Sequence, residues 1–363
     1  MDSSVFESRD LPVKVRISPT KGREFLAKTR LEAQQTLFRV FPYATAIFDS
    51  HKKRVCAHCL CVHPTRAFST RCTSCDQIYF CSLTCSEAYL SSSTVDHSVI
   101  CGLLRKLATF KSDPHTKSVA KLVILCLWER RREAHNLGWD RSDNWWNPEL
   151  AAYSEDALTS SFEQVQALES HYNDWPEDDK KDWRRMQQFL YNQLSTAQLL
   201  TPHETLQDIM HLVSRIESNG FGIFLENKTA KGAVLIALFP LASLFNHDCG
   251  NNCEVEQCTE DKLEEEGTEV TVEVEPPKQN KKKTLPKTSV VKIIYPAVFS
   301  QPRGTFRVMK ISTVRAIEID EALTISYIDA TLPVSARRQL LLDEYYFKCQ
   351  CERCIKESSG NKK

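Results

Sequence analysis

Cysteine and histidine residues in the first third of the chain fall into four closely spaced pairs. The pairs are Cys56-x2-Cys59, Cys72-x2-Cys75, Cys81-x3-Cys85 and His97-x3-Cys101. A two-residue gap lets a tight turn direct both thiolates at one ion, and a three-residue gap suits one helical turn. Tetrahedral zinc takes four ligands, so these eight ligands predict two structural zinc ions. Because this segment has few large apolar side chains, the metals would contribute to its folding.

A second group of cysteines lies near the C-terminal end of the sequence. Cys349, Cys351 and Cys354 offer three thiolates, which predicts a third zinc ion with one ligand from elsewhere. The candidates are Cys249, Cys253 and Cys258, and spacing does not choose among them. Cys61, His63 and Cys126 are interpreted as ordinary surface or packing residues.

Composition excludes several other classes of protein. The 363 residues include 47 basic and 47 acidic side chains, which argues against a protein that binds nucleic acid through its overall charge. No apolar run approaches the roughly 18 residues that span a bilayer, and residues 1–10 are polar, unlike a targeting signal. We therefore expect no membrane association and a reducing compartment, where clustered cysteines bind metal rather than form disulfides.

Hydrophobic patterning predicts an α+β fold. Strand-like alternation precedes the cysteine pairs, and helical patterns follow them, including an apolar stretch over residues 119–128 that indicates a buried helix. Residues 233–239 form a short buried strand pattern, and a helix is expected from Ser335 to Tyr346. Residues 259–289 carry an acidic block followed by lysines, which predicts a solvated insertion.

Three short stretches indicate a ligand site. Leu244–Cys253 is a polar loop after an apolar run, and its amide and imidazole groups suit directional hydrogen bonding. The stretch Glu321–Asp329 is a strand that ends near Tyr327. The third stretch, Tyr345–Cys349, places aromatic side chains directly before the last cysteine group.

Together these stretches resemble the motifs of SET-domain protein lysine methyltransferases, and the paired cysteines resemble a MYND zinc finger. Residues 246–252 correspond to the family's N-H-S-C-x-P-N loop, and residues 320–327 correspond to its E-E-L-T-I-S-Y strand. The resemblance covers about residues 12–356 and implies a SET-type β fold split by the finger and by a helical insertion, with a zinc-bound tail. The implied segments are 12–50 (first part of the SET domain), 51–102 (finger), 103–217 (helical insertion), 218–335 (SET core with the charged insertion), 336–356 (post-SET region) and 357–363 (tail).

The resemblance also implies ligand sets and site residues. The finger pairs would interleave, and Cys249 would complete the third zinc. The implied zinc ligands are Cys56, Cys59, Cys81 and Cys85; Cys72, Cys75, His97 and Cys101; and Cys249, Cys349, Cys351 and Cys354. The implied S-adenosylmethionine-binding residues are Gly22, Arg23, Asn219, Asn246, His247, Tyr327 and Phe347, and the implied catalytic residues are Tyr327 and Tyr345.

The sequence departs from the family pattern at three positions. Glu24 replaces a glycine of the cofactor loop, Asp248 replaces a serine, and Asn251 replaces a proline. The chain ends nine residues after Cys354, so we expect it to lack the helical-repeat domain of many animal relatives.

The expected function is methyl transfer from S-adenosylmethionine to a lysine of a histone or another protein, in the nucleus and cytoplasm. The alternative is a scaffold whose MYND finger binds proline-rich peptides and whose SET domain is weak or inactive. A nucleic-acid role for the lysines at 281–283 is not expected, because an acidic block lies beside them. A monomer is the default expectation, and the substrate and methylation degree do not follow from the sequence.

Overall fold

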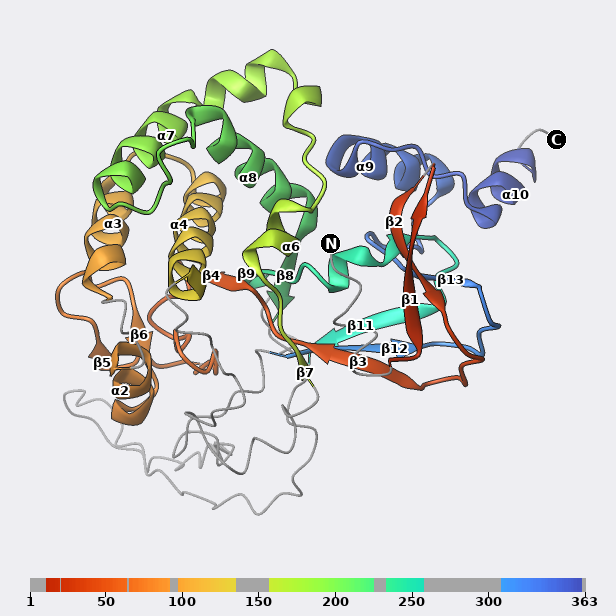
Figure 1. Cartoon of the computed structure of the whole chain (residues 1–363), viewed down its shortest axis with the longest axis horizontal. Helices are drawn as coiled ribbons and strands as arrows, with labels where there is room; N and C mark the ends of the chain where they lie inside the picture. Colours follow the sequence, from red (N-terminus) through yellow and green to blue (C-terminus); the bar gives the residue numbers. More distant parts are fainter. Residues whose placement is uncertain are drawn as a thin grey trace, which may run out of the picture.

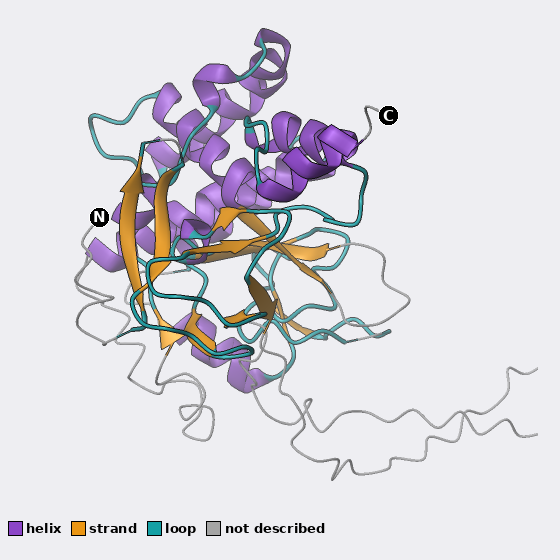
Figure 2. Cartoon of the chain, turned by 90° about the vertical axis from the view of Figure 1, so that its right-hand side faces the viewer, coloured by secondary structure: helices purple, strands orange, loops and turns teal. Residues whose placement is uncertain are grey.

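The computed structural model describes residues 11–19, 21–63, 65–91, 97–134, 157–224, 233–257 and 308–360. The predicted charged insertion at 259–289 and residues 361–363 of the predicted tail (357–363) lie outside these ranges. Most of the helices lie on one side of the strands, and a short helix lies on the opposite side, as Figure 2 shows. Within the described ranges, no helix combines the length and the hydrophobicity needed to cross a membrane.

One sheet brings together segments that are far apart in the sequence. Its order is β1 (Val13–Ser18), β2 (Gly22–Ala27), β13 (Ala322–Ile325) and β10 (Asn246–His247). Strands β1 and β2 form an antiparallel hairpin, and Gly22 at its turn has a φ of +66°. A left-handed φ of this kind favours glycine. Strand β10 runs parallel to β13, which sets the polar loop beside the strand that leads to the predicted tyrosine.

Two further sheets complete the β region. The first has the order β11 (Cys253–Gln257), β12 (Met309–Thr313), β3 (Thr36–Val40) and β7 (Ala157–Leu158), and the second has the order β4 (Ala44–Ile47), β9 (Ala233–Leu238) and β8 (Gly220–Phe224). The sheets share one hydrophobic core. Three of its aromatic rings lie with centroids 4.9 to 5.9 Å apart and belong to Phe25, Phe38 and Phe245. Strand β7 pairs with β3, so the segment expected to be a helical insertion also adds a strand to the sheet.

The helical layer follows the finger in the chain. It contains α3 (Ser98–Thr109), α4 (Pro114–Ala134), α6 (Phe162–Gln166), α7 (Glu177–Thr196) and α8 (Leu206–Asn219). Helix α4 lies among the others in Figure 1 and is buried on nearly all sides from Ser118 to Trp128. This confirms the buried helix predicted from its continuous apolar run. The same hydrophobic core extends into the finger, so the finger and the helical layer pack as one body.

The finger is built from β5 (Thr70–Arg71), β6 (Tyr79–Phe80) and α2 (Leu83–Ser91). Leu60 and Asp76, each directly after a two-residue-gap pair, have left-handed φ values of 60° and 55°. The chain therefore turns sharply after each of these pairs. His97 and Cys101 lie on one helical turn as predicted, because the amide of Cys101 donates to the carbonyl of His97 at 2.9 Å at the start of α3. Cys81 instead lies two residues before α2, so the pair Cys81 and Cys85 straddles the start of that helix.

The C-terminal part consists of two helices, α9 (Val334–Tyr345) and α10 (Glu352–Gly360). Helix α9 agrees with the predicted helix to within one residue at each end. It ends where Tyr346 adopts a left-handed φ of 62°. The last three cysteines lie in and beside the start of α10, and their sulfurs lie within 4.8 Å of that of Cys249, which closely follows β10.

Candidate active site and zinc clusters

Three groups of four cysteine or histidine side chains meet in the structure. In each group the candidate ligand atoms all lie within 4.8 Å of one another. All of these cysteines are free thiols, so the disulfide alternative has no support among the described residues. Thiolate sulfur and imidazole nitrogen are the donors that tetrahedral structural zinc prefers, and the donor sets therefore fit zinc. The groups are Cys56, Cys59, Cys81 and Cys85; Cys72, Cys75, His97 and Cys101; and Cys249, Cys349, Cys351 and Cys354.

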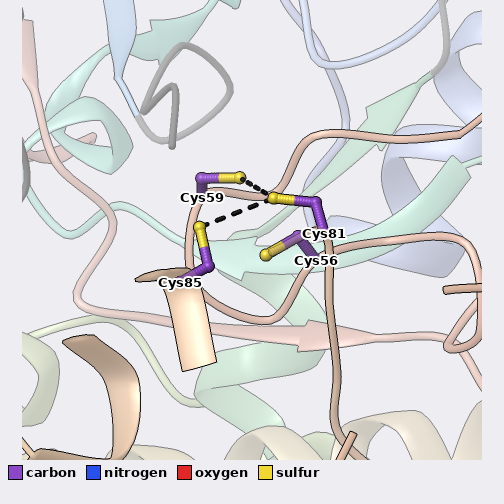
Figure 3. A group of neighbouring side chains, drawn as sticks. All are labelled: Cys56, Cys59, Cys81 and Cys85. Carbon is purple, nitrogen blue, oxygen red and sulfur yellow. Dashed lines mark hydrogen bonds between the residues drawn. The ribbon is translucent and has the colours of Figure 1, made fainter. Parts of the chain in front are cut away.

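The first group has the interleaved arrangement that the family resemblance implied. Figure 3 shows its four thiols pointing toward one another, with 3.6 Å between the Cys59 and Cys81 sulfurs and 3.5 Å between those of Cys81 and Cys85. The amide of Cys85 donates to Ser82 Oγ at 3.1 Å, so the serine caps the helix that carries this ligand. Cys61 is buried beside the group, which makes it a packing residue rather than a surface residue.

The third group joins the end of the chain to the polar loop. The sulfur of Cys249 lies 3.5 Å from that of Cys354. Cys253 lies instead in β11, where it is buried in the sheet core. Cys258 lies outside the described residues. The structure thus brings Cys249, and not Cys253, to the three cysteines of the tail.

His247 connects this third group to the predicted tyrosine. Its Nδ1 accepts a hydrogen bond from the backbone N–H of Tyr327 at 3.0 Å, and its Nε2 faces the Cys249 sulfur at 3.3 Å. Burial lowers the pKa of His247 to about 4, so the ring is neutral near pH 7. Since Nδ1 is an acceptor, the proton resides on Nε2 and is directed at the sulfur.

Asn246 fixes the turn of the β1–β2 hairpin. Its Nδ2 donates to the backbone carbonyls of Lys21 at 3.3 Å and Arg23 at 3.1 Å. Gly22 lies between these carbonyls, and a Cβ added there would meet no atom within 4 Å. Glycine is therefore required at this turn by its backbone conformation and not by a close neighbour.

Arg23 and Asn219 meet at the segment that follows α6. The guanidinium of Arg23 donates to the carbonyl of Ala167. The amide of Asn219 donates to the carbonyls of Glu169 at 3.2 Å and Arg215 at 2.9 Å. These two residues, from the hairpin and from the end of α8, thus form a second group that is joined to Asn246 through the backbone of Arg23.

Three aromatic side chains and His247 form one ring cluster. The ring centroid of Tyr327 lies 4.9 Å from Tyr345 and 5.5 Å from His247, and that of Phe347 lies 6.1 Å from His247. The hydroxyl of Tyr327 donates to the carbonyl of Phe245 at 2.8 Å. Burial, and then the nearby Tyr345, raises the pKa of Tyr327, so the phenol stays neutral.

Comparison with curated proteins yields matches along nearly the whole chain. Histone-lysine N-methyltransferase Smyd1 of Mus musculus is 25% identical over 345 residues, which cover 95% of this chain and 56% of the relative. Histone-lysine N-methyltransferase SMYD3 of Homo sapiens is 25% identical over 349 residues, covering 94% and 62%. SET domain and MYND-type zinc finger protein 6 of Schizosaccharomyces pombe is 43% identical over 60 residues, covering 15% and 12%. The long matches include both the finger and the sheet region.

The chain is therefore similar, along nearly its whole length, to proteins of the SET- and MYND-domain family. It spans about half the length of the first curated relatives it matches, with 56% of Smyd1 covered. No protein-family model matches the chain. Among solved structures, the SET domain of LSMT bound to lysine and AdoHcy has a TM-score of 0.41 at 13% identity, covering 95% of this chain and 56% of that one. A TM-score this low adds nothing to the assignment.

The three departures from the SET and MYND family pattern have local structural roles. Glu24 is buried and accepts hydrogen bonds from Arg16 at 2.9 and 2.6 Å across the hairpin. Asp248 Oδ1 accepts from the amide of Gly250 at 2.8 Å, which closes an Asx-type turn. Asn251 donates to the carbonyl of Cys253 at 2.9 Å. Side-chain hydrogen bonds thus hold the loop in which the family has a proline.

Sequence reasoning missed two residues that the structure places beside the site. His171 stacks on Tyr346, and Arg337 contacts the third cysteine group. Neither lies in a motif, and neither has a spacing that distinguishes it from other residues of a helical region. Their contacts join segments remote in sequence, so only the tertiary arrangement reveals them.

Proposed function

We propose that the protein is a protein-lysine N-methyltransferase, with S-adenosylmethionine as methyl donor and a lysine of a histone or another protein as acceptor. The supporting relatives are named histone-lysine N-methyltransferases. The observation that carries the proposal is the hydrogen bond from the Tyr327 amide to His247, because it unites the polar loop and the tyrosine strand at one site.

The residues around the hairpin turn fit a polar, zwitterionic cofactor. When bound, S-adenosylmethionine supplies a methyl group activated by its sulfonium charge. Asn246 and His247 would line its site together with Gly22 and Arg23 of the hairpin, and Asn219 would line it from α8. Phe347 lies beside His247 and would cover the cofactor from the tail side.

The ring cluster fits a lysine side chain. A free lysine has a pKa of about 10.4 and must lose its proton before it can act as a nucleophile. The aromatic rings of Tyr327 and Tyr345 would disfavour the charged amine by desolvation. The Tyr327 hydroxyl, anchored on the carbonyl of Phe245, would orient the amine for in-line attack rather than remove its proton.

The proposed partners follow from the same assignment. The substrate is a protein or peptide lysine, and the finger is proposed to bind proline-rich peptides. We further propose a monomer that acts in the nucleus and cytoplasm, without nucleic-acid or membrane binding.

The test combines cofactor binding with methyl transfer. Calorimetry with S-adenosylmethionine is done on protein with about three zinc ions per chain, followed by transfer of a tritiated methyl group to core histones and lysate proteins. Tyr327→Phe should lower turnover about 100-fold while cofactor binding remains, because misorientation of the reactants is costly. Tyr191→Phe in α7 is the matched control and should behave as wild type.

Two results would contradict the proposal at different points. A zinc-replete protein that does not bind S-adenosylmethionine would favour the scaffold alternative. Full turnover by Tyr327→Phe with intact cofactor binding would remove Tyr327 from the mechanism but would leave the methyltransferase activity in place.

A further inference from the structure

Arg337 is a buried cation beside the third cysteine group. It lies on α9 with only 1% of its surface exposed. Its Nη1 donates to the carbonyl of Leu332 at 2.5 Å, and its Nη2 donates to Glu357 Oε2 at 2.7 Å and to the Cys354 sulfur at 3.5 Å. Its Nε is buried and has no hydrogen-bond partner among the described residues.

A guanidinium buried to this extent needs nearby negative charge. Removing a charge from water is costly unless it is paired and hydrogen-bonded. Glu357 supplies one partner, but 37% of its side chain is exposed, so solvent screens part of that attraction. The remaining contacts of the guanidinium are to a neutral carbonyl and to sulfur. The part of the Arg337 charge that Glu357 does not compensate therefore faces the sulfur of Cys354.

The cysteine group can supply that negative charge when it holds a metal. Cysteine ligates zinc as the thiolate, so four thiolates around one divalent ion leave a net charge of about −2. Arg337 interacts with the thiols of both Cys354 and Cys249. Cys354 is the last cysteine of the tail, and Cys249 is the ligand from the polar loop. One cation thus contacts the tail through Cys354 and interacts electrostatically with Cys249 of the polar loop.

We propose that Arg337 is the built-in counter-charge of the C-terminal zinc cluster and retains the metal by neutralising part of the charge on its thiolates. Arg337 is a positioning residue, since it acts on the metal through Cys354 and Cys249. This role goes beyond the proposed methyl transfer and does not depend on it. Retained metal would keep the tail, and with it Phe347, against His247.

Two neighbouring arginines provide matched controls because they bind the same cluster differently. Arg338 Nε donates to the backbone carbonyl of Cys349 at 3.0 Å. Arg353 Nη1 donates to the backbone carbonyl of Cys249, also at 3.0 Å. Both contacts hold ligand backbones, whereas the Arg337 contact is made to sulfur.

The experiment measures zinc content and the rate of zinc transfer to a chromogenic chelator at fixed pH. The full chain is used, and the two finger zinc ions serve as an internal reference. Arg337→Met should release one of the three ions about 10- to 100-fold faster than wild type, the range found for partners of metal ligands. Arg337→Lys, which keeps the charge, should release it more slowly than Arg337→Met. Arg338→Gln, which removes contacts to ligand backbones but leaves the charge beside the sulfur in place, should also release it more slowly than Arg337→Met.

A second variant keeps the test decisive if Arg337→Met does not fold. Glu357→Gln changes a partly exposed side chain and leaves the thiolates as the anionic partners of Arg337. Zinc release from the C-terminal cluster should then be slower than in wild type. Glu357 also accepts a hydrogen bond from Arg353, and Arg353→Gln is the control for the loss of that contact. Wild-type release rates in Arg337→Met would overturn the proposal, as would unchanged or faster release in Glu357→Gln.

Discussion

The imidazole ring of His171 stacks on the phenol ring of Tyr346, with 4.7 Å between the ring centroids and 20° between the ring planes. His171 directly precedes the short helix η1 (Tyr172–Asp174) in the helical layer. Tyr346 lies between Tyr345 and Phe347, the two tail aromatics proposed to contact lysine and cofactor. The helical layer therefore fixes the position of the residue that separates them.

Loss of this stack should impair catalysis more than cofactor binding. An aromatic pair contributes about 0.5 to 1.5 kcal/mol beyond its buried area, so His171→Ala should lower kcat about 2- to 10-fold. The affinity for S-adenosylmethionine should change little. Steady-state kinetics and calorimetry separate the two effects, and His203→Ala, at an exposed position, is the control. An unchanged kcat would show that the stack does not position the tail aromatics.

Asn252 should be a major contributor to the stability of the polar loop. It is buried, its Oδ1 accepts from the amide of Thr324 at 2.8 Å, and its Nδ2 donates to the carbonyl of Ala322 at 2.8 Å. Asn252→Ala leaves both backbone groups buried without these partners, which should lower the free energy of unfolding by about 2 to 4 kcal/mol. Urea denaturation measures the loss.

The matched control for this prediction is Asn251→Ala. The Asn251 side chain is half-buried and makes one hydrogen bond, to the carbonyl of Cys253. Its loss should cost about 1 kcal/mol. Equal losses in the two variants would contradict the role assigned to Asn252.

Removal of zinc from the finger should destabilise the helical layer as well. The cysteines of the finger belong to the same hydrophobic core as α3, α4, α7 and α8. Cys72→Ser should therefore increase amide hydrogen exchange in α4 (Pro114–Ala134), although this helix holds no proposed metal ligand. Exchange that rises in the finger alone would mean that the two regions are energetically separate.

The pH dependence of methyl transfer should follow the substrate amine and not Tyr327. Burial raises the pKa of Tyr327, so its phenol stays protonated while the neutral fraction of the substrate lysine grows with pH. The rate should therefore rise from pH 7 toward the lysine pKa without a descending limb from this tyrosine. Profiles of kcat/KM for wild type and Tyr345→Phe should both rise in this way. A decline below pH 9 in protein that remains folded would contradict the expectation.

The sequence by itself determined the elements whose signal is local. Each cysteine pair is defined by its own spacing, because one turn of chain must direct two thiolates at one ion. The buried helix α4 and the helix α9 follow from continuous or periodic apolar residues in one segment. For the same reason, the polar loop with Asn246 and the strand that leads to Tyr327 could be recognised as motifs before their relative positions were known.

Only the tertiary structure decided which local units meet. Spacing left the fourth ligand of the third group open, and the parallel pairing of β10 with β13 brings Cys249 to the tail while Cys253 enters the sheet core. The contacts of Arg337 with sulfur and of His171 with Tyr346 arise in the same way, between segments remote in sequence. Packing of the whole core sets such contacts, and no periodicity or spacing within one segment encodes them.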